Sequence, residues 1–214
     1  MISLKFPPLH KLLGKDIAEL PEDSPKRGIA VLADHAIVVN ERYLLFFNMK
    51  DYFIKQNGID DEEIMEVLGS IMDFMHGRMF KKAFWEELTK GAIVSVEDNT
   101  LQLDGAVRKD LIYSDQSFDS SEILEMLKRS ANGEPMDVSR SAIYVEPLFD
   151  ILNIMKGYVK KDSVAFEYMG VNTMVRFTFE SNPWMFGLVS SDPMLTSKGF
   201  LFQRMGMLYQ QVKE

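Results

Sequence analysis

The stretch YVEPLFDILNIMKGYVKKDSVAFEYMG, residues 144–170, combines a helix and a strand and decides how the rest of the chain is interpreted. Pro147 suits the first turn of a helix, and apolar residues recur at helical spacing as far as Met155. Runs rich in β-branched and aromatic residues follow the helix. The pattern predicts one helix and then three strands, at 163–169, 173–180 and 184–189.

The same order of elements occurs twice earlier in the chain. A helix predicted at 7–20 precedes three short strands, and a helix predicted at 80–91 precedes another three. These strands are predicted at 29–33, 36–39, 43–48, 92–97, 100–104 and 106–113. The units recur at intervals of roughly 65–70 residues, as a repeat of pattern with little sequence identity and a different spacer each time. This order of helices and strands predicts an α+β fold. Units joined edge to edge would hide their strand edges. Each repeat would hold one helix and a three-stranded antiparallel meander.

Other segments separate these units. Acidic residues open a helix predicted at 60–76, and Gly77 is expected to end it. The polar stretch 114–141 is interpreted as a linker with a short helix at 120–130, or as a degenerate fourth unit. The tail, 200–214, is interpreted as a final helix or a flexible arm. The domains expected from this division are 1–116 and 117–214.

The composition is typical of an intracellular globular protein. The chain has 214 residues, 46% of them hydrophobic, and a formal charge of −8, so any nucleic-acid contact requires a local basic surface. The absence of cysteine excludes disulfides and thiolate metal sites and is typical of a reducing compartment. No apolar run reaches the roughly 18 residues of a membrane span, and the N-terminal stretch lacks the pattern of a signal peptide. We therefore expect a cytoplasmic protein with no membrane contact.

Residues with catalytic chemistry are scattered. His10, His35 and His76 lack the spacing of a metal site, and no P-loop, G-x-S-x-G or G-x-G-x-x-G motif occurs. The acidic pairs Asp60–Asp61 and Glu62–Glu63 would suit a divalent cation, but acidic residues also stabilise the first turn of a helix. We expect a protein that is not an enzyme and needs no cofactor or metal, with a metal-dependent hydrolase as the minor alternative.

Three stretches carry a resemblance to a known family. Residues 143–194 combine a strand, a helix of the form L-x-x-L-x-x-L, a lysine-rich turn, three strands and a closing Pro-Met element. Residues 36–47, AIVVNERYLLFF, form a strand–turn–strand pattern with Asn40 and Arg42 in the turn, and residues 84–105, FWEELTKGAIVSVEDNTLQLDG, form a second helix-and-strand unit. These stretches resemble the half-domains of DNA sliding clamps, the ring-shaped processivity factors of polymerases. The resemblance is strongest to the bacterial beta-clamp type and its small phage relatives, although clamp subunits have six or four half-domains and three are identified here.

The resemblance implies helices that line a central hole and face DNA phosphates. Basic residues do occur on or beside the predicted helices, but lysines on an exposed helix face also occur simply because they are well solvated. Both interpretations stay open for these residues. The candidate DNA-facing residues are Lys11, Lys15, Arg78, Lys81, Lys82, Lys128, Arg129, Lys156, Lys160 and Lys161.

Clamps also bind partners through a hydrophobic pocket near the C-terminal segment. By position, the resemblance places Leu188, Val189, Pro193 and Met194 at its border. For Leu188 and Val189 the alternative is that they fill the core face of a strand. Trp85 and Trp184 are better explained by core packing.

The resemblance implies a sliding-clamp-like processivity factor from a phage or mobile element. Such a protein forms a homo-oligomeric ring, binds double-stranded DNA without sequence preference and tethers a DNA polymerase or another DNA-processing protein. The alternative is a protein-interaction or regulatory module with the same fold that does not encircle DNA.

Overall fold

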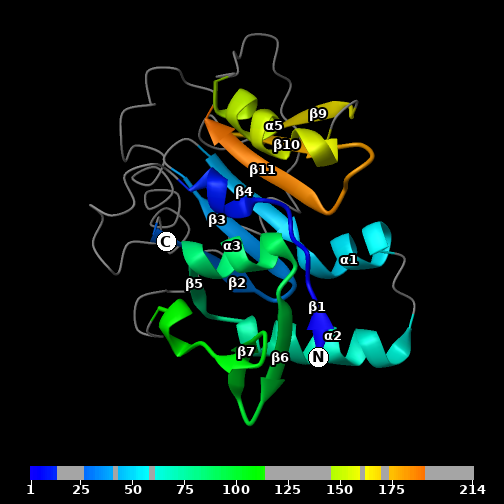
Figure 1. The fold of residues 1–214 in the computed structure, drawn as a ribbon. Coiled ribbons are helices and arrows are strands. Elements are labelled where there is room, and N and C mark those ends of the chain that lie inside the picture. The colour runs from blue at the N-terminus through cyan, green and yellow to red at the C-terminus, as the bar shows by residue number, and fades with distance from the viewer. Residues whose placement is uncertain are drawn as a thin grey trace, which may run out of the picture. The chain divides into compact units, whose positions relative to one another are not determined.

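The computed structural model describes residues 1–13, 27–40, 43–57, 61–113, 146–159, 162–169 and 174–190 (Figure 1). These residues form an α+β fold, as the sequence predicts. The α-helices in them are α1 (Met49–Asn57), α2 (Glu62–Met75), α3 (Lys82–Lys90) and α5 (Glu146–Val159). The chain divides into two compact units. The first contains Met1–Val38 and Phe46–Phe118, and the second contains Val39–Leu45 and Asp119–Glu214.

The strands before residue 113 belong to two antiparallel sheets. One has the order β1-β6-β7-β8, and the order of the other begins β5-β2-β3-β4. The strands are β1 (Ile2–Ser3), β2 (Gly28–Leu32), β3 (His35–Val39), β4 (Tyr43–Asn48), β5 (Met79–Lys81), β6 (Ile93–Glu97), β7 (Thr100–Leu103) and β8 (Ala106–Val107).

Each meander in these sheets is extended by a strand from elsewhere in the chain. β1 precedes the first meander, β2–β3–β4, but pairs with β6 of the second, with Ile2 opposite Val94. β5 precedes the second meander, β6–β7–β8, but pairs with β2 of the first, with Phe80 opposite Ile29. The two halves of the chain up to β8 thus exchange their leading strands. Because each leading strand satisfies backbone groups at the edge of the other meander, neither half completes its own sheet.

Two tight turns shape the second meander. Asp98 and Asn99 join β6 to β7 with φ of 48° and 54°, and Asp104 and Gly105 join β7 to β8 with φ of 50° and 78°. Two successive residues with positive φ are the requirement of a type I′ hairpin turn, which asparagine, aspartate and glycine meet at least cost. The Asp104 carboxylate also accepts a hydrogen bond from the Ile93 backbone N–H at 2.9 Å. The dipeptides DN and DG therefore set the register of β6, β7 and β8.

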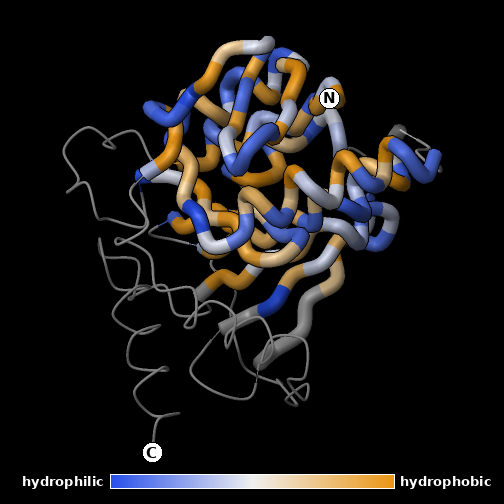
Figure 2. The backbone as a smooth tube through the Cα atoms, turned by 90° about the horizontal axis from the view of Figure 1, so that it is seen from below, coloured by the Kyte–Doolittle hydropathy of each residue, from blue (hydrophilic) through white to orange (hydrophobic). Residues whose placement is uncertain are grey.

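An aromatic cluster fills the core of the first unit. The ring of Phe6 lies 4.8 Å from that of Phe53 and 5.6 Å from that of Trp85, centroid to centroid, in edge-to-face geometry. Phe47 lies 5.0 Å from Tyr52 in the same cluster. Figure 2 shows hydrophobic and hydrophilic residues mixed along the backbone, but β4 is buried along almost its whole length, so both of its faces pack into the core. The cluster joins the N-terminal segment, β4, α1 and α3 in one core.

The second unit contains α5 and the strands β9 (Val164–Met169), β10 (Met174–Phe179) and β11 (Met185–Ser190), ordered β11-β10-β9. β4 is next to β11 in the strand order, and its first residues belong to this unit. A Cβ at Gly187 would lie 2.8 Å from the carbonyl oxygen of Leu44 and would overlap the Phe177 ring, so only glycine fits there. Phe177, Phe179 and Trp184 are buried. The apolar face of α5 is buried as well, through Leu148, Ile151, Met155 and Val159.

Asp162 connects the start of β9 to the turn after β10. Its Oδ1 accepts hydrogen bonds from the backbone N–H groups of Ser163 and Ser181, at 2.9 and 2.8 Å. Its Oδ2 accepts a short hydrogen bond from the Asn182 side chain. Burial raises the pKa of this carboxyl, but the hydrogen bonds from Ser181, Asn182 and Ser163 outweigh burial and hold the pKa below its ordinary value. A charged Asp162 thus holds the start of β9 against the turn that follows β10.

Most predicted elements are confirmed within one or two residues. The helix predicted to end at Met155 continues to Val159, and three further details are wrong. The strand predicted at 106–113 ends at Val107, because a 3-10 turn, η4 (Lys109–Leu111), follows. The helix predicted at 80–91 begins at Lys82, because Phe80 belongs to β5. A continuous helix at 7–20 is excluded, since the 3-10 turn η1 (Leu9–Leu12) ends at Leu13 in an extended conformation. Residues 14–20, the short helix predicted at 120–130 and the tail lie outside the described residues.

Helix α1 has no counterpart in the sequence prediction. It begins directly after β4, and the Asn48 side chain accepts a hydrogen bond from the Asp51 backbone N–H at 2.9 Å, as an N-cap residue does. Its apolar residues Tyr52, Phe53 and Ile54 are consecutive and include a β-branched and two aromatic side chains, which favour a strand. Burial of Tyr52 and Phe53 in the aromatic cluster supports the helix instead.

Candidate nucleic-acid interface

Five of the ten predicted DNA-facing residues are described, and three of them lie close to α3. Lys11 is exposed on η1, Lys81 ends β5, and Lys82 is the exposed first residue of α3. Arg78 lies between α2 and β5, and Lys156 lies on α5. The other five, Lys15, Lys128, Arg129, Lys160 and Lys161, lie outside the described residues.

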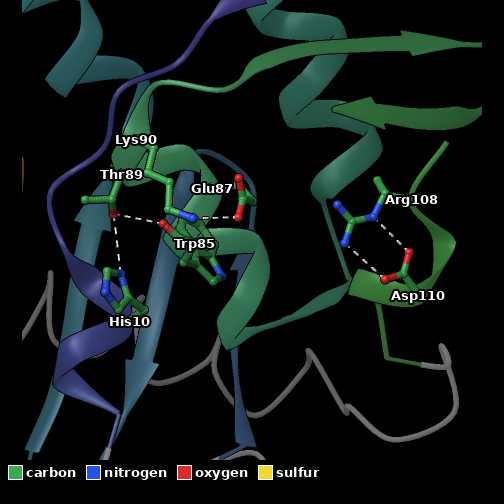
Figure 3. A network of polar contacts seen from close by, with 7 residues as sticks. All are labelled: His10, Trp85, Glu87, Thr89, Lys90, Arg108 and Asp110. Carbon is green, nitrogen blue, oxygen red and sulfur yellow. Dashed lines mark hydrogen bonds and ion pairs between the residues drawn. The ribbon is translucent and has the colours of Figure 1, made fainter. Parts of the chain in front are cut away.

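The N-terminal segment packs along α3 and brings η1 beside it. The backbone N–H of Phe6 donates to the Leu88 carbonyl at 3.1 Å, and that of Leu4 donates to the Ala92 carbonyl at 3.1 Å. The Thr89 hydroxyl lies 2.8 Å from the Trp85 carbonyl and 3.4 Å from Nδ1 of His10 (Figure 3). Since the hydroxyl donates its one proton to Trp85, it accepts from His10, which assigns the proton to Nδ1 of the imidazole.

The pKa of His10 shows which charged side chains lie near this contact. Burial lowers its pKa below the ordinary value, and the nearby cations Lys11, Lys82 and Lys90 lower the pKa further, whereas Glu86 raises it. Lysines from two segments therefore act on one imidazole. The effect places Lys11 of η1 in the same local field as both ends of α3.

Ion pairs occupy the exposed side of α3. Nζ of Lys90 lies 2.8 Å from a carboxylate oxygen of Glu87, one turn away (Figure 3). Nζ of Lys82 lies 3.8 Å from a carboxylate oxygen of Glu86. Hydrogen bonding to Glu87 raises the pKa of Lys90, so this lysine stays charged at neutral pH.

The segment with η4 adds a second group of charges on the other flank of α3. Nε and a terminal nitrogen of Arg108 donate to the two carboxylate oxygens of Asp110, at 3.1 and 3.2 Å (Figure 3). Hydrogen bonding to Asp110, and the charges of Asp110 and Glu87, raise the pKa of Arg108. The Lys81 ammonium lies 5.2 Å from the centroid of the Tyr113 ring, a cation–π distance, and acts on Asp110.

We call this set of charged residues the α3 surface. It has six cations and three carboxylates, a local excess of positive charge in a protein of charge −8. Its members are Lys11, Lys81, Lys82, Lys90, Arg108, Lys109, Glu86, Glu87 and Asp110. The sequence of α2, by contrast, has four carboxylates, Glu62, Glu63, Glu66 and Asp73, and no basic residue. Positive charge is thus gathered on one surface of the first unit, and such a surface attracts polyanions.

Two predicted DNA-facing residues are not part of the α3 surface. The guanidinium of Arg78 donates to the Phe74 carbonyl and lies 3.9 Å from the centroid of the Phe74 ring. A cation bound to the last carbonyls of α2 stabilises that helix end, which accounts for Arg78 structurally. Lys156 is exposed on α5 in the second unit, where the exposed neighbours Phe149, Asp150 and Asn153 add no positive charge.

The sequence did not point to Lys90, Arg108 or Lys109 as members of this surface. Lys90 had the signal of a cation in the last turn of a helix, which is explained by the helix dipole alone. Arg108 and Lys109 were placed in a predicted strand, so their position beside α3 was hidden by the wrong extent of β8.

The predicted partner pocket is only partly described. Leu188 and Val189 lie in β11, and both side chains are buried, with 6% and 0% of their surface exposed. Pro193 and Met194 lie outside the described residues. The buried side chains contribute to the core of the second unit.

Comparison with protein-family models, with curated proteins and with solved structures gives no match to this chain. Within the described residues, no helix is long and apolar enough to cross a membrane. The same residues contain no group of three or more histidine, aspartate or glutamate side chains that could hold a metal ion.

Proposed function

We propose that the protein is a non-enzymatic, sliding-clamp-like factor that contacts duplex DNA through the α3 surface. The observation that carries the proposal is the gathering of six cations from four separate segments around one helix of an acidic protein. Charges from distant parts of the chain converge there only because η1 and η4 pack against α3. A positive local field of this kind favours a polyanionic partner.

The chemistry of the surface fits binding without sequence preference. Lysine and arginine side chains in exposed positions bind phosphate oxygens, and phosphate contacts carry no direct base information. Each phosphate that is neutralised releases counterions, so affinity falls steeply with salt. Weak, exchangeable contacts of this kind let a protein move along a duplex while it holds a replication partner at high local concentration.

The topology supports the same proposal. Up to β8, the chain has two strand–helical segment–meander halves that exchange leading strands, and α5 with β9–β11 repeats the helix-and-meander order. Meanders of this kind present strand edges through which further units or further copies of the chain can pair. A homo-oligomeric ring of such units is the assembly that we propose.

Lys82→Gln/Lys90→Gln tests the DNA contact directly. We expect weaker binding to a short duplex, measured by fluorescence anisotropy, and a shallower dependence on salt, because fewer phosphates are neutralised. Lys50→Gln/Lys55→Gln removes the same charge from exposed positions of α1 and is the matched control. Equal effects of the two variants would show that only net charge matters and would contradict the proposed interface.

An interaction module that does not encircle DNA is the second candidate. It is favoured by Phe149, which has 59% of its surface exposed on α5 beside Asp150, a combination that suits a protein partner better than DNA. Molar mass from light scattering separates the two functions. A stable oligomer retained on circular but not on linear DNA supports the clamp, and a monomer without this difference supports the module.

A further inference from the structure

Three cations of the α3 surface are already held by carboxylates of the same surface. The pairs are Lys90 with Glu87 at 2.8 Å, Lys82 with Glu86 at 3.8 Å, and Arg108 with Asp110 at 3.1 Å. A carboxylate oxygen in each pair occupies a position from which a DNA phosphate oxygen would bind the same cation. Phosphate binding at this surface is therefore an exchange between two anions.

The stability of α3 accounts for Glu86 and Glu87 only in part. Glu87 precedes Lys90 by three residues, an order that stabilises a helix, but it lies in the last turn, where negative charge interacts unfavourably with the helix dipole. Lys82 precedes Glu86 by four residues, which is the less stabilising order of an i,i+4 pair. The acidic residues of α2, by contrast, include two in the first turn, where the dipole favours them. Another role for the two glutamates is thus open.

The ion pairs are exposed enough for a ligand to displace them. The side chains of Lys90 and Glu87 have 69% and 36% of their surface exposed, and those of Lys82 and Glu86 have 48% and 41%. Ion pairs in such positions are screened by solvent and contribute little net free energy. A duplex with closely spaced phosphates can therefore replace them, while the displaced carboxylates remain near the phosphates and repel them.

We propose that Glu86 and Glu87 are internal competitors that limit the affinity of the α3 surface for duplex DNA. The inference rests on the proposed DNA contact and names the residues that set its strength. Each glutamate holds a lysine in place while DNA is absent. It also reduces the favourable free energy of DNA binding, because its ion pair with the lysine must be broken first. The result is a contact that exchanges rapidly along the duplex, as a sliding protein requires.

Glu86→Gln/Glu87→Gln tests this role in the full-length protein. Binding to a short blunt-ended duplex is measured by fluorescence anisotropy at several salt concentrations. We expect the dissociation constant at low salt to fall about 2- to 25-fold, the range for two exposed ion pairs. The matched control is Glu66→Gln/Asp73→Asn on α2, which changes the net charge by the same amount at exposed positions. Circular dichroism confirms that each variant is folded.

The outcomes separate this inference from the function on which it rests. A larger gain in affinity for the α3 variant than for the α2 control supports the competitor role. Equal gains, or no gain, overturn it, and the DNA contact still stands if Lys82→Gln/Lys90→Gln weakens binding. If neither the wild type nor the glutamine variant binds duplex DNA, the proposed DNA contact fails and the inference fails with it.

Discussion

At the scale of single residues, two glycines of the first unit occupy opposite environments. A Cβ at Gly28 would lie 2.5 Å from the Phe80 carbonyl oxygen and 2.9 Å from Cγ of Met79, so β2 and β5 approach closely only because a side chain is absent. Gly69 lies inside α2, where a Cβ would meet no atom of the described structure within 4 Å. The same residue type therefore permits close packing at one position and only weakens a helix at the other.

These environments predict opposite effects of alanine. We expect Gly28→Ala to lower the free energy of unfolding by about 1–3 kcal/mol, because strands must separate to admit the methyl group. Gly69→Ala should raise it by up to about 1 kcal/mol, because alanine restricts the unfolded chain and favours helix. Urea denaturation of both variants measures the changes. A neutral Gly28→Ala variant would contradict the close approach of β2 and β5.

His10 predicts how stability depends on pH. Its pKa is lowered in the folded protein, so between the folded value and the unfolded value of about 6.5 the unfolded chain binds more protons. This contribution is complete above the unfolded value of about 6.5 and is lost as the pH falls from there through the lower folded pKa. We expect the Tm to fall on acidification. His10→Asn, which keeps a donor for Thr89 but does not titrate, should reduce the fall, although the burial of His35 contributes in the same direction. An unchanged pH profile would contradict this role of His10.

At the scale of elements, the sequence predicted a feature correctly where residues next to each other in the chain are enough to cause it. The dipeptides Asp98–Asn99 and Asp104–Gly105 predict tight turns, and both turns have the positive φ values that these residues tolerate. Gly91, predicted to end α3, has φ of 89° and donates back to the last turn. Helix α1 and η4 were missed because their conformations depend on packing in the aromatic cluster and on the bridge between Phe80 and Ile112.

The meander β9–β10–β11 depends on Asp162. Asp162→Ala removes three hydrogen bonds that join the start of β9 to the turn after β10, and bonds to a charged acceptor contribute more than neutral ones. We expect the variant to lose about 1–3 kcal/mol of unfolding free energy. In the wild type, the contribution is present above the unfolded pKa of about 3.9 and is lost as the pH falls through the lower folded value. Chemical denaturation at neutral and at acidic pH measures both effects, and Ser163→Ala is a control because only the backbone of Ser163 contributes the bond.

At the scale of the whole molecule, charge is distributed unevenly. The protein has a formal charge of −8, yet the α3 surface has an excess of cations and α2 has only carboxylates. This distribution attracts a polyanion to the α3 surface and repels it from α2. For the proposed DNA contact, it predicts that the α3 surface faces the duplex.

The size of the α3 surface bounds the salt dependence of DNA binding. Six cations can neutralise at most six phosphates for each chain, so the slope of log K against log salt should be no steeper than about −5. Anisotropy titrations across a salt series measure the slope. A steeper slope for a single chain would show that basic residues outside the α3 surface take part.

The sequence by itself determined the α+β class, the order of most helices and strands, and the turns, because hydrophobic period and turn residues act over a few neighbours. It also determined the absence of thiol chemistry. Only the tertiary structure decided that β1 and β5 exchange between meanders, and that Lys90, Arg108 and Lys109 join Lys11, Lys81 and Lys82 around α3. Strand pairing and charge clustering depend on contacts between residues far apart in the chain, and no local pattern specifies which of those contacts form.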